Sequence, residues 1–345
     1  MRMIPLSNIL QSIATRAVRP YSIRELYGWG VLYGLLIGHA ERDHFWANAP
    51  HVITIDKRTR YSIELDLSWW SDRLTYFPGR WADLPAQLIL DTPVNPGGLV
   101  VDVGANRGSF ALYASRRVGE SGRVICFEPN PECVTLLKRA IEINSIRNIE
   151  VFNLGLSDSA GTLTLTIPKI NSGEATFGAT RYFKGETHAV DAEVRRGDSI
   201  ISALAPTLIK IDVGGFEARV LRGLSTTIAE SRPLIITEIL SSHLADCDSS
   251  VDELVQLMTS QNYRGFEIRL STDYSDWTLA PLTCRADCDA LWIPDEGMSN
   301  ELDARVKRRT DFTSGAAGPL RQEQRRRSSL SASIRILCPI SNRAR

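Results

Sequence analysis

The 345-residue sequence has no long hydrophobic run, because its longest apolar stretch, Val31 to Ile37, is far too short to cross a bilayer. It also lacks a secretory signal, since the isolated arginines near the N-terminus are not followed by a sustained apolar segment. These absences predict a chain without a membrane span, and we expect a cytoplasmic location.

Cysteine and histidine are scarce, with six and five residues. The cysteines have neither the spacing of metal ligands nor the density of a disulfide framework, which favours reduced thiols. His39 and His44 are five positions apart and lack a third ligand. The sequence therefore predicts no metal site.

Net charge is also absent, since 40 basic residues balance 40 acidic ones, and nothing global indicates a nucleic-acid partner. The charge is unevenly placed, however. Residues 299–345 hold eleven basic and four acidic residues and have little apolar periodicity. We expect this segment to be a basic, mostly disordered tail.

The dinucleotide fingerprint GxGxxG is missing, but a related pattern is present in LVVDVGANRGSF, residues 99–110. An apolar, β-branched strand is followed by a turn from Gly104 to Gly108 and then by a helix, as in the first half of a βαβ unit. The glycines are interpreted as letting a ligand approach the strand end. Asp102 at the strand tip would repel a pyrophosphate and attract a sulfonium or ammonium group, which favours S-adenosylmethionine over NAD.

Strand and helix patterns alternate along residues 99–293 and predict an α/β fold with a doubly wound, largely parallel sheet. We expect the main strands at residues 99–103, 123–127, 149–154, 208–213, 233–239, 263–270 and 290–293, and a further pair at 162–167 and 188–195. Helices are expected from 131 to about 144, at 216–224 and at 251–261.

Residues 1–95 predict an α+β extension, with a helix over 23–38 and two strands around a turn at Lys57 and Arg58. A cluster of aromatic residues follows, which either packs in a core or forms a substrate lid: Trp69, Trp70, Tyr76, Phe77 and Trp81.

Several acids follow predicted strands. Glu128 lies 20 residues beyond Gly108, where such a fold places an acid that binds ribose hydroxyls, and Pro129 stiffens its turn. Lys210 and Asp212 lie on one side of a strand by its period of two. Glu217 opens the next helix, where an acid is favoured by the helix dipole or by function.

Glu238 ends the next main strand and faces the same edge, so Asp212, Glu217 and Glu238 could converge near Asp102. A hydroxyl acceptor needs a general base, for which Asp212 is the first candidate, ahead of Glu238 and Glu217. His243, just beyond that strand, is either a further base or a surface histidine.

The motifs VVDVGANRGSF, FEPNP, LSDSAG, LIKIDVGGFEARVLRG and PLIITE, in this order and spacing, resemble the FkbM family of S-adenosylmethionine-dependent methyltransferases over about residues 97–240. The resemblance implies a class I methyltransferase (Rossmann-like) fold, whose seven-stranded sheet ends in an antiparallel strand. It assigns residues 96–298 to the catalytic domain, between the N-terminal extension and the tail.

The resemblance also implies roles for single residues. Those expected on the methionine side of the cofactor are Asp102, Gly104, Ala105, Asn106 and Gly108. Glu128 would hold the ribose, residues 153–158 with Asp158 would lie near the adenine, and Asp212 would lie beside the methyl group. The implied reaction is O-methylation of a hydroxyl on a small molecule or glycan, such as a sugar or secondary metabolite.

The chain departs from the family at Gly214, where the family usually has glutamate. The loss of this carboxylate leaves open a weakened protein that only binds the cofactor or a partner. An NAD(P)-dependent oxidoreductase is disfavoured by Asp102 and by the missing fingerprint.

Overall fold

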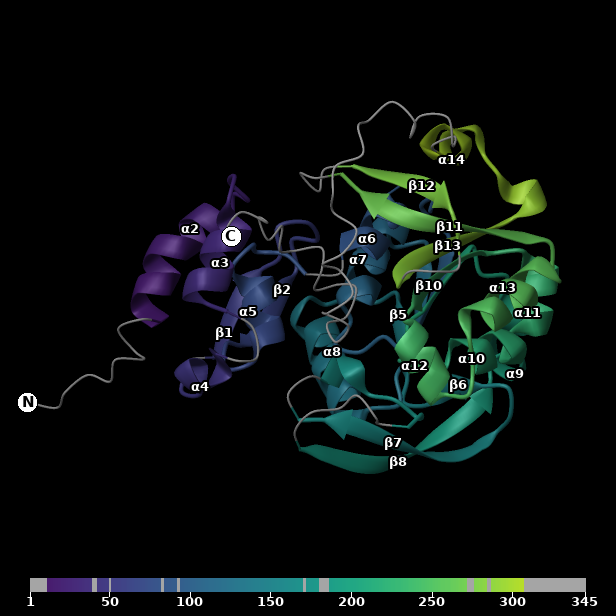
Figure 1. Ribbon diagram of the computed structural model, residues 1–345, viewed down its shortest axis with the longest axis horizontal. Helices are drawn as coiled ribbons and strands as arrows, with labels where there is room; N and C mark the ends of the chain where they lie inside the picture. Colours follow the sequence, from purple (N-terminus) through teal and green to yellow (C-terminus); the bar gives the residue numbers. More distant parts are fainter. Residues whose placement is uncertain are drawn as a thin grey trace, which may run out of the picture. The chain divides into compact units, whose positions relative to one another are not determined.

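The computed structural model describes residues 11–38, 42–49, 51–81, 84–91, 94–169, 172–179, 186–271, 276–283 and 287–306. They form two compact units (Figure 1). Unit 1 contains the described residues up to 81 together with Arg139–Ser145, and unit 2 contains the other described residues.

Unit 1 combines short helices with a two-stranded antiparallel sheet. Its elements are η1 (Ala14–Val18), α2 (Arg19–Ser22), α3 (Trp29–Leu36), α4 (Asp43–Trp46), β1 (His51–Ile55), β2 (Ser62–Asp66) and α5 (Trp70–Tyr76). The two predicted strands are confirmed, with Ile55 paired to Ser62 at the turn. The helix expected over 23–38 begins only at Trp29, because Gly28 has a left-handed backbone that separates it from the preceding turn.

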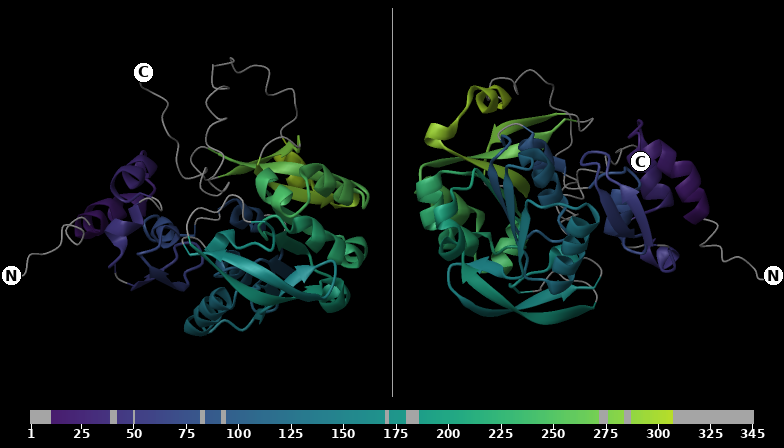
Figure 2. Two further views of the ribbon diagram at one scale, coloured as in Figure 1. Left: turned by 60° about the horizontal axis from the view of Figure 1, so that its bottom comes forward. Right: turned by 180° about the vertical axis from the view of Figure 1, so that it is seen from behind.

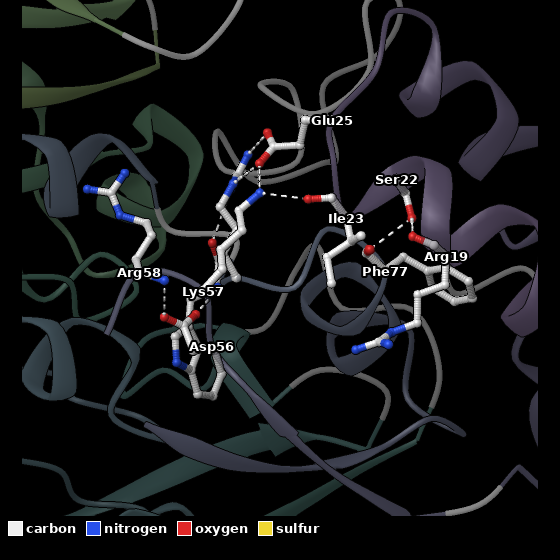
Figure 3. A network of polar contacts seen from close by, with 10 residues as sticks. Arg19, Ser22, Ile23, Glu25, Asp56, Lys57, Arg58 and Phe77 are labelled. Atoms are coloured by element: carbon white, nitrogen blue, oxygen red, sulfur yellow. Dashed lines mark hydrogen bonds and ion pairs between the residues drawn. The ribbon is translucent and has the colours of Figure 1, made fainter. Parts of the chain in front are cut away.

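The core of unit 1 is built around Phe77, which is fully buried and makes edge-to-face contacts with Tyr33, Trp46 and Tyr76. The aromatic cluster is therefore a core feature of this unit. An ion-pair network lies beside it (Figure 3): Glu25 accepts hydrogen bonds from the buried Arg80 and from Lys57. Such a buried charge is stable only because it is paired.

Unit 2 is organised around an eight-stranded sheet in the order β12-β11-β13-β10-β9-β3-β4-β5. The strands are β3 (Leu99–Val103), β4 (Arg123–Phe127), β5 (Ile149–Phe152), β9 (Leu208–Ile211), β10 (Leu234–Ile239), β11 (Tyr263–Leu270), β12 (Trp277–Pro281) and β13 (Cys288–Pro294). Every expected main strand is present.

The five strands from β10 to β5 are parallel, and β13 runs antiparallel between β10 and β11. This is the doubly wound class I arrangement with its antiparallel last strand. The expected count of seven strands was one too low, since β12 adds an edge strand to β11. Its Trp277 and Leu279 are buried, but the intervening Thr278 and the short length of the run gave no distinct sequence pattern.

Helices cover both faces of this sheet, with α6–α8 on one side and α9–α11 and α13 on the other (Figures 1 and 2). The helices are α6 (Leu84–Leu90), α7 (Ser109–Val118), α8 (Pro131–Ile143), α9 (Asp198–Ile201), α10 (Glu217–Gly223), α11 (Ser225–Ser231), α12 (Ser241–Asp246), α13 (Val251–Thr259) and α14 (Asn300–Arg305). The core between the layers consists of the apolar strand residues and the inner faces of these helices.

A second, three-stranded sheet in the order β6-β8-β7 completes unit 2. It contains the predicted pair β7 (Gly161–Pro168) and β8 (Thr187–Arg196), which is antiparallel, and β6 (Gly155–Ser157) pairs in parallel with β8. The short 3-10 helices are η3 (Ser172–Glu174), η4 (Ser202–Leu204) and η5 (Asp295–Gly297).

The start of the predicted tail is ordered. Ser299 caps α14, Leu302 is buried, and Arg305 donates hydrogen bonds to Asp276 and to the carbonyl of Trp277. One buried leucine in a polar segment leaves no periodic pattern, so the sequence did not indicate this helix, and the expectation of a mostly disordered tail stays a prediction. The rest of the predicted tail, residues 307–345, lies outside the described residues.

Candidate functional site

The carboxyl ends of β3, β4, β9 and β10 bring the predicted acids together. In the register of the sheet, Asp102 pairs with Lys210, and Thr237 pairs with Ile211, so Asp212 and Glu238 follow at adjacent strand ends. Glu128 follows the end of β4, next to β3. Open α/β sheets bind their ligands at this edge.

The turn after β3 is fixed by contacts within the protein. The amides of Gly104 and Ala105 both donate to the carbonyl of Phe127. Gly104 has φ +80°, and a Cβ there would lie 1.9 Å from the carbonyl oxygen of Asp212. The glycine is therefore required by the close approach of the end of β9, and the expectation that the glycines let a ligand approach stays a prediction.

Glu128 is buried against the same turn. Its carboxylate accepts hydrogen bonds from the amides of Asn106 (2.7 Å) and Asn130 (2.8 Å). Burial, together with the charges of Asp102 and Asp212, raises the pKa of Glu128 to about 7, against the lowering effect of these two hydrogen bonds. Glu128 thus holds the turn in shape, a role that its place in the sequence did not reveal.

The Asn153 side chain fixes the backbone that follows Glu128. Its amide donates to the carbonyl oxygens of Glu128 (2.9 Å) and Pro129 (3.2 Å). Asn153 comes directly after β5, so its side chain ties two neighbouring strand ends together. Asn153 therefore lies beside the Glu128 turn.

Lys210 is the buried cation of this edge. Its Nζ lies 2.9 Å from Oδ2 of Asp212 and 4.0 Å from Oδ1 of the fully buried Asp102, and 5.6 Å from the ring centre of Phe110. The prediction that Lys210 and Asp212 lie on the same side of their strand is confirmed. A lysine inside an apolar strand indicated from the sequence that Lys210 needs a charged partner. The contact with Asp102 was not visible there, because Asp102 lies on another strand.

Glu217 holds the turn between β9 and α10. Its Oε1 accepts from the amides of Val213 and Gly215, both at 3.2 Å, and its Oε2 has no hydrogen-bond partner among the described residues. The side chain is 2% exposed. Burial raises the pKa of Glu217 to about 7, opposed by the backbone hydrogen bonds and assisted by the charge of Asp212.

Gly214 lies in the same turn, beneath the segment 172–179. It has φ +58°, and a Cβ there would lie 2.8 Å from the carbonyl oxygen of Ala175. The hydroxyl of Thr176 donates to the carbonyl of Gly214 (2.8 Å). The position where the family has glutamate therefore has no room for a side chain in this arrangement.

Glu238 is half-buried and pairs across the sheet with another acid, Asp289. Burial and the charges of Asp212, Asp289 and Glu217 raise its pKa well above the ordinary value, while Lys210 lowers it. His243 is half-buried on α12, which follows β10, and its carbonyl packs against Gly215.

Asp158 has different neighbours from the other predicted residues. Its two carboxylate oxygens lie 3.6 Å from Arg219 and 4.0 Å from Arg222, both on α10. The hydroxyls of Ser157 and Ser159 also donate to Asp158, so its polar contacts are with its own segment and with α10. The structure therefore gathers the predicted acids at one edge, apart from Asp158.

We predict that Glu217→Gln stabilises the protein at pH 8 by up to about 3 kcal/mol and has little effect near pH 4. The folded pKa of about 7 lies above the ordinary 4.5, so the native carboxyl group binds its proton more tightly and stability falls as pH rises between these values. Glutamine keeps the acceptor for Val213 and Gly215 and does not ionise. Urea unfolding across this pH range measures the effect.

The exposed Glu230 provides the control for this substitution. Glu230→Gln is expected to change stability by less than about 0.5 kcal/mol at either pH. If Glu217→Gln destabilises the protein equally at pH 4 and pH 8, then ionisation of this carboxyl group is not what limits stability.

The donor set fits a positively charged ligand. Lys210 lies beside the carboxylates of Asp102 and Asp212, and Glu128 and Glu238 lie at the two flanking strand ends, so carboxyl groups outnumber the one ammonium at this edge. Within the described parts of the chain, no three or more His, Cys, Asp or Glu side chains are arranged so that they could hold a metal ion. The described helices include none long and apolar enough to span a membrane.

The sequence matches the model of the methyltransferase FkbM domain over residues 102–265. It is 30% identical over 208 residues to methyltransferase sdnD of Sordaria araneosa, covering 51% of this chain and 76% of that protein. It is also 26% identical over 204 residues to methyltransferase 1 of Beauveria bassiana, covering 54% and 78%.

A solved methyltransferase FkbM from Methylobacillus flagellatus KT is similar at 18% identity and a TM-score of 0.37. The match covers 83% of this chain and 58% of that one, so this chain spans little more than half of its length. The family model and the relative from Sordaria araneosa, together with the strand order and the acidic edge, show that this chain belongs to the FkbM methyltransferase domain family and is an S-adenosylmethionine-dependent methyltransferase.

Proposed function

We propose that the chain methylates a hydroxyl oxygen of a small molecule, such as a sugar or a secondary metabolite, with Asp212 as the general base. The observation that carries this proposal is the row of carboxylates at the ends of β3, β4, β9 and β10, with one buried lysine among them. S-adenosylmethionine supplies the methyl group already activated by its sulfonium charge.

The cofactor half of the site is the turn from Gly104 to Gly108 together with Glu128 and Pro129. The buried charge of Asp102 lies under this turn and favours the cationic methionine end of the cofactor. Each oxygen of Glu128 accepts one backbone hydrogen bond and keeps a second lone pair, which suits the two ribose hydroxyls. A place for Asp158 near the adenine stays a prediction.

The acceptor half is the strand end of β9 and β10. The side chain of Asp212 is 37% exposed, while Glu217 is 2% exposed and holds the turn. An acceptor hydroxyl can therefore reach Asp212 from solvent, and Glu238 at the adjacent strand end is the alternative. In-line positioning of the hydroxyl supplies roughly 7–11 kcal/mol of the barrier in well-oriented reactions.

The glycine at position 214 is compatible with an active enzyme. Glu217 and Thr176 hold this turn from both sides, so its shape does not depend on a glutamate at position 214. The missing carboxylate left open a weakened protein that only binds the cofactor or a partner. The geometry of this turn does not require that alternative.

Methyl transfer from radiolabelled S-adenosylmethionine to matched alcohols, amines and thiols tests the proposal. We expect label in the alcohols, in a bond that resists mild alkali as an ether does. Transfer only to nitrogen, sulfur or carbon would contradict the hydroxyl assignment, although the chain would remain a methyltransferase.

A further inference from the structure

Helix α3 of unit 1 is apolar on both faces. Trp29, Tyr33 and Ile37 are buried in the unit. The opposite face is also apolar, with Val31, Leu32, Leu35 and Leu36 exposed at 43%, 36%, 61% and 53%. A surface helix normally carries polar residues on its outer face, so this outer face is suited to an apolar environment.

The apolar surface continues into the turn before the helix. Leu26 is 42% exposed, and Tyr27 is fully exposed. Tyrosine combines an apolar ring with a polar hydroxyl, which suits a boundary between water and hydrocarbon. We call Leu26, Tyr27, Val31, Leu32, Leu35 and Leu36 the α3 face.

The exposed charges in the segment that contains the α3 face have one sign. Within the described range 11–38, the exposed charged residues are Arg16 and Arg24, and the only acid is Glu25. Glu25 is neutralised, because Arg80 donates to both of its carboxylate oxygens, at 2.9 and 2.8 Å. Lys57 pairs with Glu25 as well (Figure 3). The described range 11–38 therefore offers an anionic surface arginines and no unpaired carboxylate.

We propose that the α3 face docks unit 1 onto an anionic lipid bilayer, with the leucines in the interfacial region and Arg16 and Arg24 toward the phosphates. An apolar helix face flanked by basic residues binds membranes in this manner without crossing them. A second copy of the chain fits less well, because a two-fold contact would bring the same arginines toward each other.

Flotation of the full chain with lipid vesicles tests this docking. Vesicles of phosphatidylcholine with roughly 30% phosphatidylglycerol are compared with pure phosphatidylcholine. We expect the chain to float with the anionic vesicles, and the double variant Leu35→Glu/Leu36→Glu to lose binding by roughly tenfold or more. Arg16→Glu/Arg24→Glu should weaken binding to the anionic vesicles only.

The matched control is Leu136→Glu/Ile143→Glu on α8, whose side chains are 41% and 40% exposed. This variant should float like the unmodified chain, and all variants should show unchanged thermal unfolding. Equal flotation of the α3 variant would overturn the proposal and assign binding to another region, such as the basic C-terminal segment. A dimer in sedimentation that the α3 variant dissociates would assign the face to a second copy instead.

Discussion

Asp212→Asn is expected to lower the rate of methyl transfer by about 10²–10⁴-fold, the usual contribution of a general base. Asparagine has the same shape and can still accept a hydrogen bond from Lys210, which lies 2.9 Å from Asp212 Oδ2, but it cannot take up the proton of the acceptor hydroxyl. Since the change leaves the Gly104 turn and Glu128 in place, cofactor affinity should change by less than about threefold. Initial rates and calorimetric titration measure the two quantities.

Glu238→Gln is the comparison for Asp212→Asn, because Glu238 lies at the adjacent strand end and has a raised pKa. If Asp212 is the base, Glu238→Gln should retain more activity than Asp212→Asn. The opposite order would move the base to Glu238. A loss of cofactor affinity without a loss of turnover in Asp212→Asn would give Asp212 a binding role only.

Gly104→Ala is expected to destabilise unit 2 by about 2–5 kcal/mol and to abolish cofactor binding. Alanine in a left-handed backbone costs about 1–2 kcal/mol, and its Cβ would lie 1.9 Å from the carbonyl oxygen of Asp212. Relief of that contact requires β3 and β9 to separate, at a further cost of about 1–3 kcal/mol. This movement would displace Asp212 and the turn together. Urea unfolding and calorimetry measure both effects.

Gly119→Ala is the matched control, because Gly119 also has a positive φ, of +70°, but a Cβ there would meet nothing within 4 Å. It should cost about 1–3 kcal/mol through backbone strain alone and leave cofactor binding unchanged. Equal losses of binding in the two variants would show that the strand approach at Gly104 does not shape the site.

The parts of the fold that follow from local patterns were predictable. The bounds of β3 and β4 agree with the sequence prediction, because each is a short apolar run ended by a glycine turn or by Glu-Pro. The common side of Lys210 and Asp212 follows from the period of two in any strand. The gathering of acids at one edge follows from the parallel order of the strands.

Features that arise from contacts between distant segments were not predictable from such patterns. Gly104 is needed because β9, more than a hundred residues later, approaches it. Glu128 holds the turn because its carboxylate meets the amide of Asn106 from the neighbouring strand end. Similarly, Gly214 has no room for a side chain because Ala175 lies above it. None of these contacts leaves a local pattern in the sequence.

Calorimetric titration of the full chain with S-adenosylmethionine and, separately, with NAD tests the central claim most directly. The acidic edge predicts that S-adenosylmethionine binds with a dissociation constant below about 1 mM, that NAD shows no heat of binding in the same range, and that Glu128→Ala weakens the cofactor. Binding of NAD without binding of S-adenosylmethionine, or unchanged affinity in Glu128→Ala, would contradict the assignment of this edge to the methyl donor.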